Sequence, residues 1–264
     1  MHGAFRMKSV DITNRLLVVD DEESIRFTFS EFLKGGGYLV DTADSFIAAT
    51  ALMADNDYDV VFLDIVLGRD SGMNLLRVLS EQNPNCQVVM VTGSPEIVTA
   101  AESVRLHAFD YLVKPVTQDQ LLRIAKLAAE RKQMIDAQEK FRLRMTAIFD
   151  GVREGILVFD EDGRLEDINS AAQEMLGCET ALIDLTLDEI GLACPFAQIE
   201  WLLEIVRQRC LGEIYYLQLC NAKGQNLTLS LCMSPLTNAA GQETGVVLVL
   251  RNEELPTKHL AEKS

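Results

Sequence analysis

Four apolar runs, each followed at once by a residue with reactive or charged chemistry, constrain the fold of this chain more than any other feature. The runs are rich in β-branched residues and end at residues 19, 63, 91 and 113. Continuous apolar runs of this kind are typical of parallel strands that are buried on both faces. Because the carboxyl ends of parallel strands meet at one edge of a sheet, we expect the residues that follow them to share a crevice. These residues are Asp20, Asp21, Asp64, Thr92, Lys114 and Pro115.

Helical patterns alternate with these strands. They cover 23–34, 45–55, 72–81, 95–106 and the residues from 117 onward, and a further strand is expected at 38–41. Strands that alternate with helices of about 10–15 residues predict right-handed βαβ units and a doubly wound parallel sheet. We therefore expect an α/β domain over residues 13–130, after a flexible N-terminus at 1–12.

The carboxylates predicted at the sheet edge indicate a metal site. Asp20, Asp21 and Asp64 can stay ionised together only if a cation lies among them or if their pKa values rise. Oxygen ligands favour magnesium, which prefers octahedral coordination at about 2.1 Å. A carboxylate beside such an ion can attack phosphorus, so the pattern predicts a phosphoryl-accepting site. Taken singly, an acidic pair after a strand is typical of a helix N-cap, and Lys-Pro is typical of a turn.

Four motifs occur in order along this domain. They are Val-Val-Asp-Asp-Glu at 18–22, Asp64 with Gly72 eight residues later, Val-Thr-Gly at 91–93 and Asp-Tyr-Leu-Val-Lys-Pro at 110–115. Together they resemble the receiver domain of two-component response regulators, which has a flavodoxin-like fold. The resemblance implies a sensor histidine kinase as partner and Mg2+ as cofactor.

The resemblance also implies a role for each site residue. Asp64 would be the phosphoacceptor. The implied metal ligands are Asp20 (through water), Asp21, Asp64 and the backbone carbonyl of Val66. The implied phosphoryl-binding and switch residues are Thr92, Lys114 and Tyr111, and a cis-peptide bond is expected at Pro115. Tyr111 can equally be an ordinary half-buried aromatic residue of a strand.

A helical pattern without caps continues to about residue 149. Apolar residues recur in it every seven positions, at Leu127, Met134, Phe141 and Ile148, with a weaker companion row at Ile124, Arg131, Gln138 and Met145. This repeat predicts a long linker helix over 131–149 that forms a parallel coiled coil in a homodimer. The alternative is an amphipathic helix that lies on its own domain, since two companion positions are polar.

A second domain is expected over residues 150–252, followed by a C-terminal tail at 253–264. Its pattern gives a hairpin at 155–160 and 164–169, short helices ending near 177, a helix at 197–209, and strands at 214–220, 226–233 and 245–251. With Asn-Ser-Ala-Ala at 169–172 and Leu-Gly at 176–177, it resembles a PAS domain, an α+β fold with an antiparallel sheet. Such domains bind a small molecule or couple dimers. We expect a filled apolar core, because no cofactor ligand stands out.

Histidine and cysteine usage excludes several cofactor sites. The three histidines, at 2, 107 and 259, lie outside the PAS-like span, so none can ligate haem iron there. The six cysteines include no C-x-x-C pair, which leaves zinc and iron–sulfur sites without local support. We expect buried apolar thiols in a reducing, cytoplasmic protein, with redox sensing as the alternative.

Charge and hydropathy limit the partners. The net charge of −16 opposes direct nucleic-acid binding. No apolar run approaches the about 20 residues of a membrane span, and residues 1–14 lack the apolar stretch that is typical of a signal peptide. We expect a soluble protein that does not contact a membrane.

The sequence predicts signalling without catalytic turnover. We expect no enzyme activity beyond self-phosphorylation and autodephosphorylation, and regulation of transcription or of a kinase through a missing or separate effector. A magnesium-dependent phosphatase with an aspartyl nucleophile is the alternative. It is weaker, because that nucleophile follows the first strand in a D-x-D arrangement, whereas Asp64 follows the third. A small-molecule or redox sensor acting through the PAS domain is a further alternative.

Overall fold

A computed structural model describes residues 14–68, 70–93, 108–177, 182–193, 199–209, 211–221 and 224–253. The chain divides into two compact units, Met1–Phe141 and Arg142–Ser264. None of the helices in the described ranges is both long enough and apolar enough to span a membrane.

The first unit is built on a five-stranded parallel sheet, as the apolar runs predict. In spatial order the strands are β2 (Leu39–Ala43), β1 (Arg15–Val19), β3 (Val60–Asp64), β6 (Gln87–Thr92) and β7 (Asp110–Val113). The strand at 38–41 was expected to end earlier than it does. It continues to Ala43 because it stays in parallel register with β1, where Val19 pairs with Ala43.

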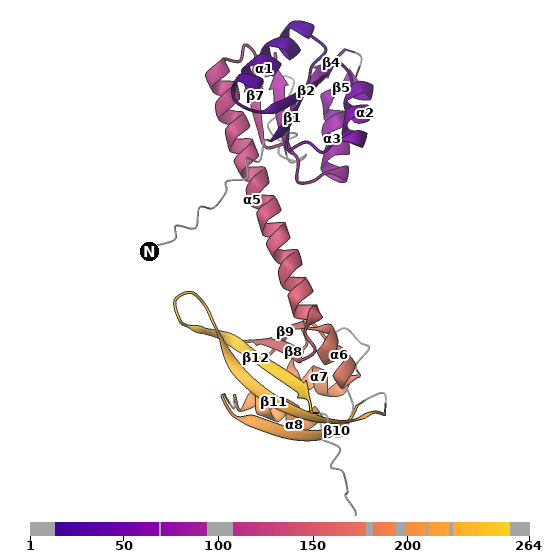
Figure 1. Cartoon of the computed structure of the whole chain (residues 1–264), viewed down its shortest axis with the longest axis vertical. Coiled ribbons are helices and arrows are strands. Elements are labelled where there is room, and N and C mark those ends of the chain that lie inside the picture. Colours follow the sequence, from indigo (N-terminus) through magenta and orange to yellow (C-terminus); the bar gives the residue numbers. More distant parts are fainter. Residues whose placement is uncertain are drawn as a thin grey trace, which may run out of the picture. The chain divides into compact units, whose positions relative to one another are not determined.

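Helices cover both faces of this sheet (Figure 1). They are α1 (Glu23–Gly35), α2 (Phe46–Asp55), α3 (Gly72–Gln82) and α5 (Gln118–Gly151). The helix expected at 95–106 lies outside the described residues. A two-residue pair that the sequence pattern does not reveal, β4 (Val66–Leu67) and β5 (Asp70–Ser71), joins β3 to α3.

Each face of the sheet has its own apolar core, because alternate strand residues point to opposite sides. Val18 and Phe62 pack with α1 and α5, whereas Val19 and Leu63 pack with α2 and α3. Residues of the three inner strands, β1, β3 and β6, are almost fully buried on both sides, which is why their sequence reads as unbroken apolar runs. The two layers of helices hold the strand ends in fixed positions.

Helix α5 changes its surroundings along its length. Residues Leu121 to Ala129 supply five buried side chains to the core of the first unit. Ile124 is one of them and is only 3% exposed, so the predicted companion row of the coiled coil is wrong at that position. The seven-residue row is exposed instead: Leu127, Met134, Phe141 and Ile148. In keeping with the alternative of a helix lying on its own domain, α5 packs apolar side chains against the receiver domain as far as Ala129, and Gln133 still donates to Asn14 Oδ1 at 3.0 Å.

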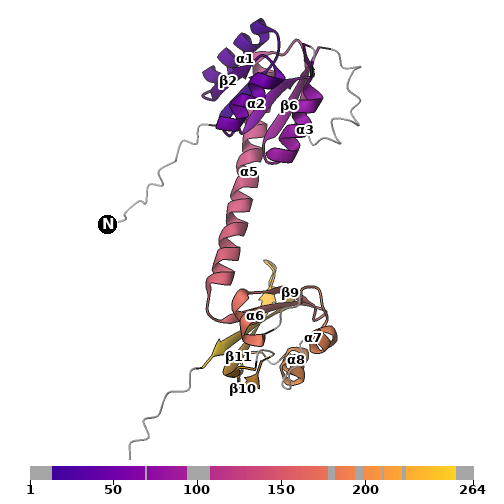
Figure 2. The same cartoon turned by 90° about the vertical axis from the view of Figure 1, so that its right-hand side faces the viewer.

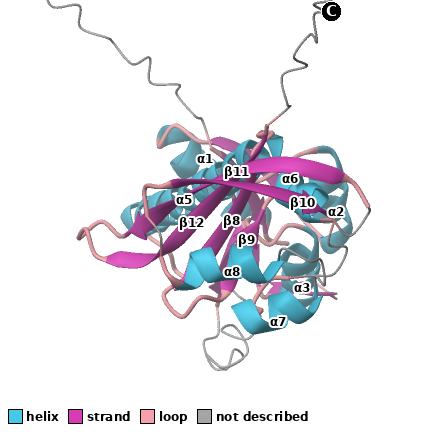
Figure 3. Cartoon of the chain, turned by 90° about the horizontal axis from the view of Figure 1, so that it is seen from below, coloured by secondary structure: helices cyan, strands magenta, loops and turns pink. Residues whose placement is uncertain are grey.

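The second unit is a five-stranded antiparallel sheet (Figure 3). In spatial order its strands are β10 (Ile214–Cys220), β11 (Asn226–Thr237), β12 (Glu243–Asn252), β8 (Gly155–Asp160) and β9 (Leu165–Ile168). The expected strand at 226–233 is longer than predicted and contains Pro235. Proline is tolerated there because the pairing with β10 ends at Cys232, which leaves β12 as the only neighbouring strand.

Three helices complete the second unit: α6 (Ser170–Leu176), α7 (Leu187–Ala193) and α8 (Ile199–Arg207). Figure 2 shows α7 and α8 side by side. The structure adds α7 to the helices that the sequence pattern indicated. One cluster of 19 buried apolar residues joins these helices to the sheet.

Candidate functional site

The sheet of the first unit brings the predicted polar residues to one edge. Asp20 follows β1, Asp64 ends β3, Thr92 ends β6 and Lys114 follows β7. Asp20 and Asp64 are only 2% and 6% exposed, and Thr92 is also buried. The edge therefore holds charged groups that water reaches poorly.

Lys114 connects the carboxylates. Its Nζ lies 2.7 Å from Asp64 Oδ2 and 2.8 Å from Asp20 Oδ2, and it also reaches Glu22 Oε1 at 3.3 Å. The backbone fixes the base of this side chain, since the Lys114 amide donates to the Thr92 carbonyl at 2.8 Å. The Lys114–Pro115 peptide bond is cis.

Burial and charge act against each other on these groups. Burial raises the pKa of the Asp20 carboxyl, and its hydrogen bond to Lys114 opposes the rise. For Lys114, burial disfavours the ammonium, but the hydrogen bonds to Asp20 and Asp64 outweigh it and raise its pKa above the usual range. The lysine therefore stays protonated at neutral pH and acts as a fixed positive charge.

The acidic cluster fits a magnesium ion. One oxygen from each of Asp20, Asp21 and Asp64 lies within 4.8 Å of the others. Ligands of an octahedral ion with bonds of about 2.1 Å stand about 3 to 4 Å apart, so small side-chain movements suffice to bind one. Three carboxylates supply only hard oxygen donors, which suits magnesium and not a thiophilic metal.

The segment after Asp64 packs against it closely. The Val66 amide donates to Asp64 Oδ1 at 3.1 Å and restrains the carboxylate. A Cβ atom on Gly72 would lie 2.0 Å from the Asp64 backbone oxygen, so only glycine fits where α3 begins. The role of Val66 as a carbonyl ligand stays a prediction.

Tyr111 lies apart from this cluster. It is on β7 and is 58% exposed, so the interpretation as a half-buried strand aromatic is wrong. Its edge strand pairs only with β6, which leaves the ring open to solvent. Its role in switching stays a prediction.

Sequence reasoning missed two contacts at this site. The Arg26 guanidinium donates to the Asp20 carbonyl at 2.7 Å, and Glu22 shares Lys114 with the two aspartates. Glu22 directly precedes α1, and Arg26, four positions later, lies in the first turn of that helix. That helical spacing was the available signal, because residues four apart lie on the same side of a helix.

The cysteines match the expectation only in part. Cys86 is buried, and burial raises the pKa of its thiol to about 12. Cys232 is partly buried, but Cys220 is exposed at the end of the edge strand β10, so the expectation of buried thiols is wrong for Cys220. The other three, at 178, 194 and 210, lie outside the described residues.

Comparison with known proteins identifies the same two domains. Residues 16–126 match the family described as response regulator receiver domain, and residues 143–207 match a PAS domain family. The alginate biosynthesis transcriptional regulatory protein AlgB of Pseudomonas aeruginosa is 39% identical over 139 residues, which are 53% of this chain and 29% of that protein. The regulatory protein AtoC of Escherichia coli is 33% identical over 121 residues, or 46% of this chain and 26% of that protein.

A solved structure, the receiver domain of NtrX from Brucella abortus, is 38% identical and covers 44% of this chain and 98% of its own, with a TM-score of 0.42. The chain spans between 29% and 39% of the AlgB proteins that it matches. The chain therefore contains a response regulator receiver domain at residues 16–126, followed by a PAS domain at residues 143–207.

Proposed function

We propose that this chain accepts a phosphoryl group on Asp64 and passes the resulting change through α5 to its PAS domain. The observation that carries the proposal is the contact between Asp64 Oδ2 and the Lys114 ammonium at 2.7 Å, beside Asp20 and Asp21. A carboxylate nucleophile, a fixed positive charge and a cation site are the parts that phosphoryl transfer requires. They support a phosphoacceptor rather than a purely structural ion pair.

In the proposed reaction an oxygen of Asp64 attacks the phosphorus of a phosphohistidine on a sensor kinase. The new O–P bond forms as the P–N bond breaks, and the imidazole leaves with the electron pair and takes a proton. Esterification removes the charge of Asp64, which frees Lys114 to bind a phosphoryl oxygen, and the Thr92 hydroxyl donates to another. When bound by Asp20, Asp21, Asp64 and the Val66 carbonyl, magnesium supplies positive charge that offsets the repulsion between carboxylate and phosphoryl group.

The output of the proposed switch begins at β7. The exposed ring of Tyr111 can turn inward when the Thr92 hydroxyl moves toward the phosphoryl group. Lys114, directly after β7, changes partners in the same step. Both changes alter the surface around β7.

Mass spectrometry tests phosphorylation directly. Incubation with magnesium and acetyl phosphate should add one phosphoryl group, which alkali removes, because aspartyl phosphates are labile to base. Asp64→Asn should show no adduct, whereas Asp44→Asn should behave like the unaltered protein, since the exposed Asp44 follows β2 at the same edge.

Two results contradict the proposal. One is the absence of an adduct in the unaltered protein at saturating magnesium. The other is sustained hydrolysis of a phosphomonoester that is lost with Asp20→Asn or Asp21→Asn and kept with Asp64→Asn, which would support the phosphatase alternative.

We further propose that the chain forms a homodimer through α5. Four apolar side chains at seven-residue spacing, Leu127, Met134, Phe141 and Ile148, are between 45% and 64% exposed. Aligned in parallel with a second copy, these side chains would bury each other along one seam. Sedimentation analysis should give a dimer that Phe141→Glu weakens. A monomer at all concentrations would contradict the proposal.

The output through transcription is a proposal from similarity. AlgB is named a transcriptional regulatory protein, and the chain matches only part of it. We propose that this chain regulates transcription or a kinase through a missing or separate effector, and that residues 1–264 do not contact nucleic acid directly, in keeping with their net charge of −16. We also propose a cytoplasmic location and no catalytic turnover beyond its own phosphorylation and dephosphorylation.

A further inference from the structure

Among the described residues of the PAS domain, a hollow large enough for a small molecule lies outside the apolar core. The helices and the sheet share a core in which Phe159, Leu229 and Leu248 are fully buried. A cleft of about 580 Å³ lies outside this core. This volume is within the range of pockets that hold small ligands, about 300–1,000 Å³.

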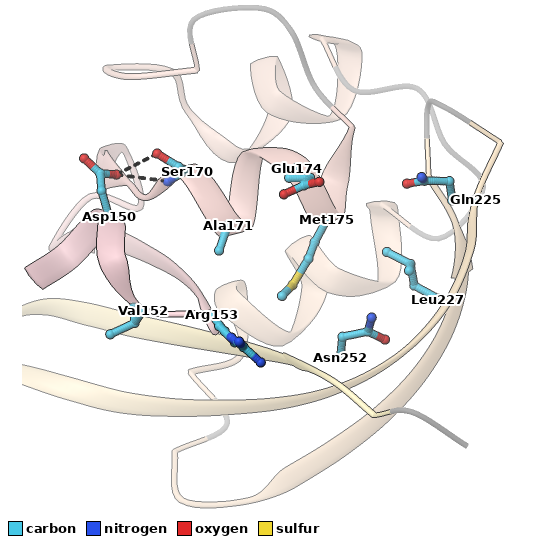
Figure 4. Close-up of a pocket in the computed structure, with 10 residues that line it drawn as sticks. All are labelled: Asp150, Val152, Arg153, Ser170, Ala171, Glu174, Met175, Gln225, Leu227 and Asn252. Carbon is cyan, nitrogen blue, oxygen red and sulfur yellow. Dashed lines mark hydrogen bonds between the residues drawn. The ribbon is translucent and has the colours of Figure 1, made fainter. Parts of the chain in front are cut away.

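Three separate parts of the domain line the cleft (Figure 4). Arg153 comes from the turn after α5, Glu174 and Met175 from α6, and Leu227 and Asn252 from the ends of β11 and β12. With Asp150 and Gln225, which also line it, the cleft combines two carboxylates, one guanidinium, two amides and an apolar surface. Figure 4 shows Arg153 and Glu174 on opposite sides of the Met175 side chain.

Two of these charged groups have no partners in the part of the chain that the structure describes. Among the described residues, the side chains of Arg153 and Glu174 form neither a hydrogen bond nor an ion pair, with each other or with any other residue. Other charged groups nearby have partners: Arg251 binds Glu154 at 3.1 Å, and Asp150 accepts hydrogen bonds from Ser170. A ligand with its own separated charges therefore finds one cation and one anion available.

We propose that this cleft binds a zwitterionic ligand, either a free amino acid or a short peptide, with an apolar side chain. Its carboxylate binds the Arg153 guanidinium, which suits a carboxylate because of its forked donors. Its ammonium binds Glu174. Its apolar side chain covers Met175 and Leu227, and the amide of Asn252 hydrogen-bonds to its polar backbone.

The cleft also lies against the joint between α5 and α6. Asp150, at the end of α5, accepts hydrogen bonds from the Ser170 amide at 3.1 Å and hydroxyl at 2.9 Å, and both residues line the cleft. Beside them, the fully buried Asn169 donates to the Phe149 and Glu154 carbonyls, each at 2.9 Å. A bound ligand would touch both sides of this hydrogen-bonded joint. Binding would therefore bias the same helix that the receiver domain uses.

Calorimetry with four leucine ligands tests the proposal on the full chain. The ligands are leucine, leucyl-leucine, its N-acetyl form and its C-terminal amide. Leucine or leucyl-leucine should bind, and which of the two binds more tightly distinguishes an amino-acid site from a peptide site. Each capped dipeptide should bind at least about ten-fold more weakly than the free one, because a charge-assisted hydrogen bond is lost.

Variants assign each charge to its partner. Arg153→Gln should bind free leucyl-leucine about ten-fold more weakly than the unaltered protein does, because the ligand carboxylate has lost its partner. The variant should bind the free dipeptide and its C-terminal amide with equal affinity. In the same way, Glu174→Gln should bind free leucyl-leucine and its N-acetyl form with equal affinity. Arg144→Gln, an exposed arginine of α5 outside the cleft, should bind as the unaltered protein does.

Three outcomes overturn the proposal. The first is that none of the four ligands binds at millimolar concentration. The second is that capped and free dipeptides bind alike, because the cleft would then recognise only the apolar part. The third is that the two cleft variants bind as tightly as Arg144→Gln.

Discussion

Replacing Lys114 with methionine should destabilise the receiver domain strongly when no metal is bound. The ammonium contacts Asp20 at 2.8 Å and Asp64 at 2.7 Å, and the three side chains are 14%, 2% and 8% exposed. Removing one partner of a buried charge pair costs about 3–5 kcal/mol, because the remaining charges lose their compensation. Lys114 keeps some contact with water, so we expect the lower end, about 3 kcal/mol.

Hydrogen exchange of the β3 amides measures this loss in the receiver domain alone. Amides in a central strand exchange only when the domain unfolds, so the exchange rate reports its free energy of unfolding. In EDTA, Lys114→Met should speed exchange about a hundred-fold, since about 1.4 kcal/mol corresponds to ten-fold. The control Lys126→Met removes an exposed ion pair in which Lys126 Nζ lies 3.8 Å from Glu130 Oε1. It should change the exchange rate by less than about three-fold.

Magnesium should then protect the variant more than the unaltered protein. Without the ammonium, the three carboxylates attract a dication more strongly, and binding to the folded state adds stability by mass action. Two results would refute the reasoning: an effect in EDTA no larger than that of Lys126→Met, or equal protection of both proteins by magnesium. Either would mean that Lys114 does not hold the carboxylates together.

Three further predictions concern other parts of the chain. Gly72→Ala should destabilise the receiver domain by about 1–3 kcal/mol in urea unfolding and slow phosphorylation by acetyl phosphate, whereas Gly93→Ala, with open space around it, should do neither. Burial raises the pKa of Tyr58 to about 12, so its contribution to stability should fall by about 2.7 kcal/mol in total, most of it as pH rises from 10 to 12. Phenolate absorbance and unfolding of Tyr58→Phe check this, and a Tyr58 that titrates at pH 10 would contradict it. Asn169→Ala should lower the free energy of unfolding of the PAS domain by at least about 3 kcal/mol, because four hydrogen bonds are lost, and hydrogen exchange of the β8 amides measures this change. The control Asn238→Ala, at an exposed turn residue, should lower it by less than half as much.

The sequence predicted the receiver fold well because local and global signals agree there. Buried parallel strands are recognisable as unbroken apolar runs, and residues at their ends must converge whatever the details of packing. This is why the sequence alone was sufficient to place Asp20, Asp64 and Lys114 together. The pairing of Lys114 with both carboxylates depends on side-chain geometry, which no spacing encodes.

Other features depend on tertiary contacts that a single sequence does not reveal. Ile124 fits the heptad row, yet it belongs to the receiver core, because the same helix serves two surfaces in turn. Pro235 lies within β11 because the neighbouring strand β10 has already ended. Tyr111 is exposed because β7 is an edge strand, and sequence alone does not give strand order. In each case the neighbouring secondary-structure element determines the burial or pairing of the residue, and that element lies far away along the chain.

The most direct measurement for the central claim is the position of the phosphoryl group. Borohydride reduces an aspartyl phosphate to homoserine, so reduction after treatment with magnesium and acetyl phosphate marks the modified residue for peptide sequencing by mass spectrometry. We predict homoserine at position 64 alone, and none when magnesium is replaced by EDTA. Conversion at Asp20 or Asp21 instead, or conversion that does not depend on the metal, would contradict the account of this site.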